Sequence, residues 1–204
     1  MSEVTAAAPA QVDEHHHTSL GIDHRKLGMW TFLASECMFF GSLITTYLLY
    51  SNRLNGGPGP KDLFQIPFTS VSSFVLLMSS LTMVLAHNAI INRDRRRLEL
   101  WLLATAMLGL TFISGQVFEF TSFVNEGMTI TDSPFSSAFF LLTGFHGAHV
   151  TIGIFMLLSL YTLSKLGKLS LDDDIRVDMI ALYWHFVDIV WIVIFTFIYL
   201  IPSY

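Results

Sequence analysis

The chain has 204 residues, of which 52% are hydrophobic and only 13% are charged, with a net charge of −5. Soluble domains carry about 25% charged residues, so this balance excludes an ordinary water-soluble protein and indicates a membrane protein with no nucleic-acid partner. The single cysteine, Cys37, excludes an internal disulfide and a cysteine-based metal site.

Residues 1–26 are predicted to form a disordered cytoplasmic tail. This stretch is polar and rich in alanine, and it lacks the apolar core that a cleavable signal peptide requires. The histidine run at residues 15–17 has no fixed geometry in such a tail, so we expect no ordered metal site there.

Residues 27–204 are predicted to form an all-α membrane domain, a bundle of five transmembrane helices. Each apolar stretch approaches the ~20 residues that cross a hydrocarbon core of ~30 Å. The stretches are too long for barrel strands and lack their polar alternation. No internal repeat is present, which disfavours a repeat-built transporter. The predicted spans are residues 27–50, 68–91, 98–124, 135–163 and 178–201.

The basic residues predict the orientation of this bundle. Nine of the eleven Lys and Arg residues fall in the N-terminal flank, the second loop and the fourth loop, all on one side of the membrane. By the positive-inside rule the N-terminus is cytoplasmic and the C-terminus external. Basic loops attract anionic lipid head groups, although such a run can also act only as a topological anchor. Head-group contacts are expected at Arg25, Lys26, Arg93, Arg95, Arg96 and Arg97.

The first three spans carry ionisable residues at membrane depth. Glu36 lies in the inner half of the first span, and His87 lies close to the inner end of the second. Glu119 follows Gln116 by three residues, so these two share a face of the third span. Each ionisable group is expensive in hydrocarbon, so it must be paired, neutral or close to water.

The fourth span contains the sequence TGFHGAHV at residues 143–150. Small side chains allow another helix to approach closely, so Gly144, Gly147 and Ala148 predict a helix contact. His146 and His149 are three apart, and we expect them to point to the same flank.

The fifth span contains the sequence YWHFVDIVW at residues 183–191. An Asp at the centre of a membrane helix costs roughly 2.5–3.5 kcal/mol. His185 and Asp188 are three apart, and Trp184, Asp188 and Trp191 follow a spacing of four and then three, so all fall on one face. This polar stripe must face protein or trapped water instead of lipid.

Three interpretations compete for these polar groups. The first is interhelical glue, in which carboxylates and imidazoles satisfy one another in the bundle core. The second is a metal or haem site, but no Glu-x-x-His pair repeats on two helices, and His146 and His149 are too close for two stacked haems. One haem between His149 and His185 remains open. The third is a proton or ion pathway with Glu36, His185 and Asp188 as relay groups, as in a stand-alone transporter.

Four motifs together resemble subunit III of the haem-copper respiratory oxidases, in both its cytochrome c oxidase and its quinol oxidase forms. They extend in the family's order over the whole chain after the tail. The motifs are SECMFF at residues 35–40, GQVFEF at 115–120, TGFHGAHV at 143–150 together with Gly153, and YWHFVDIVW at 183–191.

The resemblance implies a non-catalytic subunit of a bacterial inner-membrane terminal oxidase, which reduces oxygen and translocates protons. The haems and copper would lie in partner subunits, with this chain packed against subunit I and assembled with subunit II. In the family this subunit binds phospholipid, protects the complex from inactivation during turnover and supports proton uptake. Glu36 matches the family's intramembrane glutamate.

The chain departs from the longer family members in having five helices instead of seven. The family's lipid cleft lies between the missing first pair and the rest, and a small subunit IV could fill that gap. Residues 57–64 and the histidine-containing tail look like quinol oxidase versions. Thr143–His146 and Gly115–Gln116 look like cytochrome c oxidase versions, which we favour.

Overall fold

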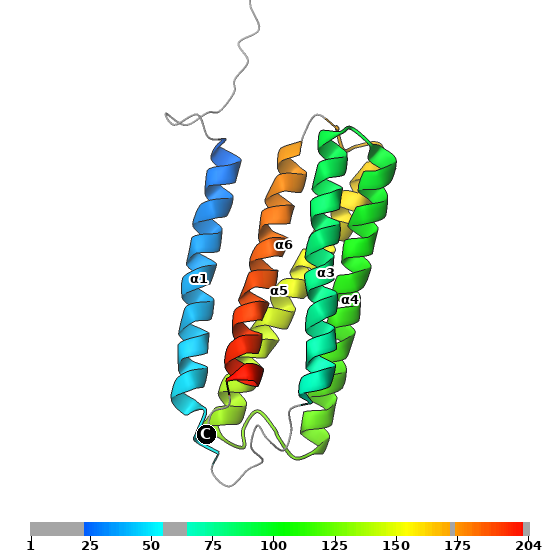
Figure 1. The fold of residues 1–204 in the computed structure, drawn as a ribbon. Helices are drawn as coiled ribbons and strands as arrows, with labels where there is room; N and C mark the ends of the chain where they lie inside the picture. Colours follow the sequence, from blue (N-terminus) through cyan, green and yellow to red (C-terminus); the bar gives the residue numbers. More distant parts are fainter. Residues whose placement is uncertain (1–22, 55–64, 172–173, 202–204) are drawn as a thin grey trace, which may run out of the picture.

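The computed structural model describes residues 23–54, 65–171 and 174–201, which fold into five long helices (Figure 1). All five are long and apolar enough to cross a membrane, which confirms the predicted all-α fold. The predicted tail up to residue 22 and the segment 57–64 lie outside the described residues. The helices are α1 (His24–Tyr50), α3 (Ile66–Ile91), α4 (Arg95–Asn125), α5 (Pro134–Lys165) and α6 (Asp174–Phe195), which continues into the π-helix η1 (Thr196–Leu200).

Several helices begin earlier than the hydropathy pattern predicts. The carboxylate of Asp23 accepts a hydrogen bond from the backbone N–H of Arg25 at 2.8 Å, so residues 24–26 belong to α1 and not to the tail. Asp94 caps α4 in the same way through Arg97 N at 3.1 Å. Capped first turns carry charge, so a window of apolar residues does not detect them.

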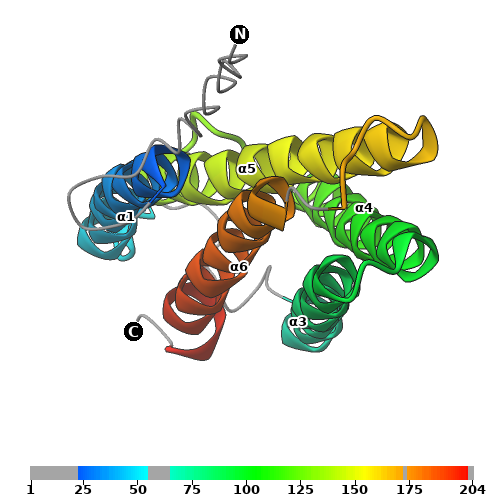
Figure 2. The ribbon, with the colours of Figure 1, turned by 90° about the horizontal axis from the view of Figure 1, so that it is seen from above.

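The five helices are not equivalent in the bundle. Helix α6 packs against α1, α3 and α5, and α4 lies beside α3 and α5 (Figure 2). Half of the α6 span is buried inside the chain, whereas only 17% of the α1 span is. Helix α1 buries Leu33, Phe40 and Tyr47, which are seven residues apart and form one narrow stripe. Helix α6 is therefore the central element and α1 a peripheral one.

The fully buried indole of Trp184 lies where α6 meets α4 and α5. A Cβ atom at Gly109 on α4 would stand 2.7 Å from the ring, and one at Gly153 on α5 would stand 2.8 Å from it. Both distances are too short for any side chain, so these two glycines allow α4 and α5 to close on Trp184. Small residues play this part widely in membrane bundles.

The small residues predicted to mediate this packing were partly the wrong ones. A Cβ at Gly144 would meet nothing within 4 Å, and Ala148 is exposed. Gly147 does make a close approach, because a Cβ there would stand 2.7 Å from Oε1 of Gln116. The spacing of small residues shows that helices can approach, but it does not say which face does so.

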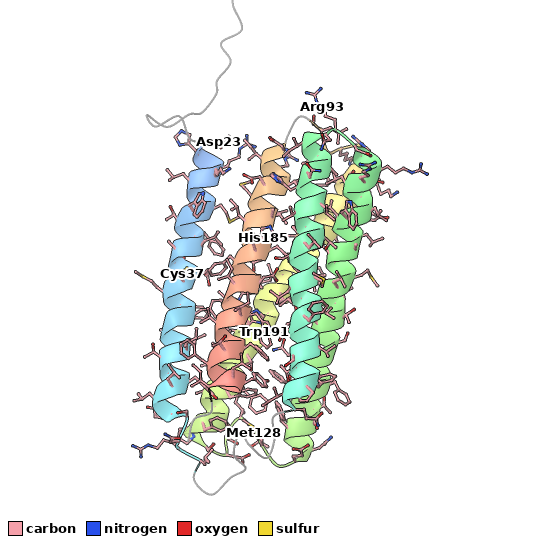
Figure 3. The ribbon with its side chains drawn as sticks, viewed as in Figure 1. Asp23, Cys37, Arg93, Met128, His185 and Trp191 are labelled. Atoms are coloured by element: carbon pink, nitrogen blue, oxygen red, sulfur yellow. The ribbon has the colours of Figure 1, made fainter. Side chains whose placement is uncertain are left out.

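The basic segments gather at one end of the bundle. The α3–α4 turn, the end of α5 and the start of α6 lie at the end where α1 begins, and the described part of the chain ends at the other (Figure 1). Asp23 and Arg93 mark the basic end, and Met128 marks the opposite one (Figure 3). We refer to the first as the basic end.

Candidate functional site

The polar stripe of α6 meets a row of serines on α3, and we call this contact the serine seam. Figure 3 shows His185 and Trp191 on the side of α6 that faces α3. Every polar side chain of the stripe finds a hydroxyl partner there, so the stripe faces protein as predicted. The seam consists of Ser73, Ser79 and Ser80 on α3 and of Trp184, His185, Asp188 and Trp191 on α6.

Two tryptophans anchor the serine seam. The indole N–H of Trp184 donates to Oγ of Ser79 at 2.9 Å, and that of Trp191 donates to Oγ of Ser73 at 2.8 Å. Each serine in turn donates its own proton to a backbone carbonyl of α3. The indole N–H groups and the two hydroxyls therefore all form hydrogen bonds inside the seam. A buried donor without an acceptor there would cost folding free energy.

Between the tryptophans, Ser80 bridges His185 and Asp188. Its Oγ lies 2.9 Å from Nδ1 of His185 and donates to Oδ2 of Asp188. A hydroxyl has one proton, so if Ser80 donates to Asp188, Nδ1 of His185 must carry the proton that it shares with Ser80. The other carboxyl oxygen of Asp188 has no partner among the described residues. The bridge is therefore a short relay with one oxygen unsatisfied.

Toward the end opposite the basic end, Glu119 of α4 meets side chains of α3 and η1. Its Oε1 accepts from Thr69 on α3 at 2.6 Å and from the hydroxyl of Tyr199 in η1 at 3.2 Å. All three side chains are buried. The π-helical turn thus supplies one of the two donors that satisfy this intramembrane carboxyl, and π turns often occur where a helix is adapted to hold a special group.

Gln116 lies one turn away from Glu119 but faces another helix. Its amide nitrogen donates to the backbone carbonyl of Thr143 on α5 at 2.7 Å, next to Gly147. Its Oε1 has no partner among the described residues. The shared face predicted for Gln116 and Glu119 is present, yet each residue joins α4 to a different neighbour.

His146 is wholly enclosed between α5 and α6. Its Nε2 lies 3.3 Å from the carbonyl of Val187, and its ring lies against Trp191 with 4.8 Å between centroids. A carbonyl only accepts, so Nε2 carries the proton, and Nδ1 is left with no partner among the described residues. This arrangement suits a neutral imidazole that joins α5 to α6.

His149 faces α1 instead. Its Nδ1 donates to the carbonyl of Phe145 at 2.7 Å, and its Nε2 lies 3.3 Å from Oε2 of Glu36. The predicted common flank of the two histidines is correct only in that both rings lie beside Phe40. Their polar atoms serve different helices.

Glu36 on α1 and His149 on α5 form a polar contact at the edge of the bundle. Nε2 of His149 lies 3.3 Å from Oε2 of Glu36, but this oxygen makes no hydrogen bond among the described residues. The contact is an ion pair only when the imidazole is protonated. Both side chains keep about a sixth of their surface exposed.

At the basic end an ion cluster ties three helices together. Nζ of Lys26 lies 2.7 Å from Oδ2 of Asp178, and Nε2 of His87 lies 3.6 Å from Oδ1 of the same carboxylate. These residues come from α1, α6 and α3. Lys26, predicted to contact lipid, is therefore engaged within the chain.

Of the other residues predicted to contact lipid head groups, some bond within the chain and others lie at the surface. Arg95 donates to the carbonyls of Ser164 at 2.9 Å and Leu169 at 3.0 Å, so it satisfies the C-terminal end of α5. Arg25 and Arg97 pair with the caps of their own helices, and Arg93 and Arg96 lie at the surface.

The described residues contain no group of three or more His, Cys, Asp and Glu side chains that could hold a metal ion. The haem considered between His149 and His185 has no support in the geometry, since His149 faces α1 and His185 faces α3. The carboxyls of Glu36, Glu119 and Asp188 lie in separate clusters with separate partners, so the contacts of these residues form no continuous relay.

The sequence interpretation missed the serines of α3, which supply the α3 side of the serine seam. A usable signal exists, because Ser72 and Ser79 are one heptad apart, as are Ser73 and Ser80. Serines are common in membrane helices, where they bond to their own backbone, and this weakens the signal.

Comparison with known proteins covers nearly the whole chain. The family model described as Cytochrome c oxidase subunit III matches residues 7–203. A protein of Bacillus sp. (strain PS3) named Cytochrome c oxidase subunit 3 is 38% identical over 199 residues, which are 98% of this chain and 94% of the relative. A Bacillus subtilis protein named Quinol oxidase subunit 3 is 37% identical and covers 85% of each chain. A Pseudomonas putida protein named Cytochrome bo(3) ubiquinol oxidase subunit 3 is 38% identical and covers 86% of this chain and 84% of the relative.

Proposed function

Since the chain belongs to the cytochrome c oxidase subunit III family, we propose that it stabilises subunit I of its oxidase and supports proton uptake through it. The chain is subunit III of a haem-copper terminal oxidase and a multi-pass membrane protein of a bacterial respiratory chain. Membership implies subunits I and II as partners, and members of this family carry no haem or copper of their own.

The observation that carries the supporting role is how the intramembrane polar groups are used. Trp184, Trp191 and Glu119 each bond to a hydroxyl on α3, and His146 bonds to the backbone of α6. These groups join helices in pairs and do not converge on a common pocket. A scaffold needs such fixed helix contacts, whereas a catalytic site needs polar groups around an open space.

The proton-related role is proposed for the pair of Glu36 and His149. A carboxyl group and an imidazole can each gain or lose a proton, and both side chains remain partly exposed. We propose that the basic end is cytoplasmic, in accordance with the positive-inside rule. Glu36 then lies in the half of the membrane from which an oxidase takes up protons.

We propose cytochrome c as the electron donor, on the likeness of Thr143–His146 and Gly115–Gln116 to cytochrome c oxidase versions. Relatives with cytochrome c oxidase names and with quinol oxidase names are about equally similar, at 38% and 37% identity. The purified complex should oxidise reduced cytochrome c faster than a short-chain quinol. The reverse order would assign the chain to a quinol oxidase.

Phospholipid and a small subunit IV are proposed as further partners. A pocket of about 380 Å³ between α4 and α5 is lined by Arg96, Arg97, Lys165 and Glu99 and by the apolar walls of Leu100 and Tyr161. Lys165 pairs with Glu99 at 2.9 Å, so Arg96 and Arg97 give the pocket the net positive charge that suits an anionic phospholipid. Helix α1 leaves most of its span uncovered, which suits a small subunit beside it. Lipid analysis of the complex should show less retained anionic lipid after Arg96→Ala with Arg97→Ala.

The proposal is tested by purifying the oxidase in mild detergent through a tag on this chain. Subunits I and II and a haem spectrum should co-purify with it, and the chain expressed alone should show no haem. Haem in stoichiometric amount on the isolated chain would overturn the proposal. Proton conduction by the isolated, reconstituted chain, abolished by Glu36→Gln or Asp188→Asn, would instead favour a stand-alone transporter.

A further inference from the structure

One polar side chain of the serine seam reaches the outer surface of the bundle. His185 is only half-buried, although it lies near the middle of the α6 span. Its Nδ1 contacts Ser80 at 2.9 Å, and its Nε2 has no partner among the described residues. An imidazole nitrogen at this depth needs a hydrogen-bond partner, because hydrocarbon offers none.

Exposed hydroxyls elsewhere on the bundle need no partner outside their own helix. Thr45 on α1, Thr111 on α4 and Ser159 on α5 each donate to the carbonyl of the residue four positions earlier, at 2.7–2.9 Å. A hydroxyl bonded in this way can face lipid without loss. His185 therefore differs from these exposed hydroxyls in needing a partner outside its own helix.

A cavity of about 330 Å³ lies between α3 and α6, farther from the basic end than His185. Its floor includes Ser73 and Trp191, which are bonded to each other, and its walls are mainly apolar. His185 and Ser80 do not line this cavity but lie on the same two helices, closer to the basic end, and we call the cavity together with these two residues the α3–α6 groove. The cavity walls include Ser70, Phe74, Leu77, Ile192, Phe195 and Thr196.

We infer that the α3–α6 groove docks a membrane helix of subunit I, whose polar side chain hydrogen-bonds to Nε2 of His185. A lipid chain would fill the apolar cavity but would leave the imidazole nitrogen unpaired. A helix meets both needs, because its side chains can pack in the cavity while one of them bonds to the histidine. The inference rests on the proposed function, which makes subunit I the partner.

The groove is tested by cross-linking in the intact oxidase. Cys37 is exposed on α1 and points away from the bundle (Figure 3), so it is first replaced by serine. Leu77→Cys then places a thiol in the groove, and Leu110→Cys serves as the matched control on α4, since the two side chains are 39% and 41% exposed. A photoreactive thiol reagent should link position 77 to subunit I, and position 110 should give at least severalfold less of that product.

A second variant tests the energetics of the same contact. Ile192→Trp places a larger side chain in the groove, so it should weaken docking. The amount of haem that co-purifies with the chain should fall about tenfold, a change in affinity within the range that overpacking of a close-packed contact causes. Leu110→Trp should leave the haem unchanged. Membrane levels of the chain, measured in parallel, separate lost docking from lost folding.

Each outcome bears on the inference. Cross-links from position 77 to subunit I support it. Cross-links only to a small subunit, to a second copy of this chain or to lipid would overturn it, as would none at all in an assembled oxidase. If the unmodified chain failed to co-purify with any haem protein, the proposed function would fail as well. This result separates failure of the proposed function from failure of the groove inference alone.

Discussion

The serine seam and the contact between Glu36 and His149, which we call the α1 contact, place polar groups in opposite environments within the membrane. In the seam, three serines of α3 meet four side chains of α6, and the tryptophans among them are fully buried. At α1, one carboxyl meets one imidazole, and both remain partly exposed on a helix that buries little of its span. The comparison teaches that polar groups buried between two helices hold those helices together, whereas a partly exposed pair on a peripheral helix contributes little to the core.

The largest effect should come from breaking the centre of the seam. Trp184→Ala removes a buried ring between two glycines together with its bond to Ser79, and it should lower stability by roughly 3–5 kcal/mol. The measurement is the midpoint of SDS-induced unfolding of the purified complex. Trp30→Ala is the control, because Trp30 is 54% exposed. Equal losses for both variants would show that Trp184 does not hold the seam.

A smaller loss should follow from Asp188→Ala. Removal of the carboxyl leaves the hydroxyl of Ser80, which also contacts Nδ1 of His185, without its acceptor, at about 1–3 kcal/mol for an unsatisfied buried group. The yield of assembled oxidase per unit of membrane measures this effect. Asp188→Asn keeps an acceptor and should lose less. Unchanged assembly in the alanine variant would mean that Asp188 faces water.

Substitution of Glu36 in the α1 contact should change the activity of the oxidase more than its stability. Glu36→Ala should leave initial electron transfer near normal and shorten the active lifetime of the oxidase, because in the proposed role the pair supports proton uptake and does not hold the core. The lifetime is read from oxygen consumption during continuous turnover. Glu36→Gln keeps the shape without an exchangeable acid and should behave similarly. Immediate and complete loss of activity in an assembled complex would contradict this view.

The smallest effect is expected at the basic end. Lys26→Ala breaks the 2.7 Å ion pair with Asp178. Both side chains are partly exposed, so the loss should be about 0–1 kcal/mol and should diminish further in high salt. SDS unfolding at low and at high salt tests this. A loss as large as that of Trp184→Ala would make α1 docking as important as the seam.

Much of the fold could be predicted because the membrane restricts the choices. A chain with five long apolar stretches can satisfy its backbone in lipid only as helices or as a closed barrel, and the stretches lacked the alternation of a barrel. The face shared by His185 and Asp188 followed from helical periodicity alone. The early helix starts were missed, because Asp23 and Asp94 cap turns that contain charge.

The sequence predicted which intramembrane carboxyls belong to the candidate site, but it did not predict the side chains that they contact. Glu36, Glu119 and Asp188 stood out, because carboxyls are rare inside membranes. Their partners are His149, Thr69 and Ser80, which come from other helices 113, 50 and 108 positions away. Serine and threonine are too common in such helices for their identity to reveal which of them turn inward.

The sequence by itself determined the all-α class, the five spans and the family, because these depend on hydrophobic length and on local motifs. Only the tertiary structure decided that His146 joins α5 to α6, that His149 lies against Glu36, and that Gly109 and Gly153 enclose Trp184. The physical reason is that periodicity defines the face of one helix, whereas a hydrogen bond or a close packing contact depends on the rotation and depth of two.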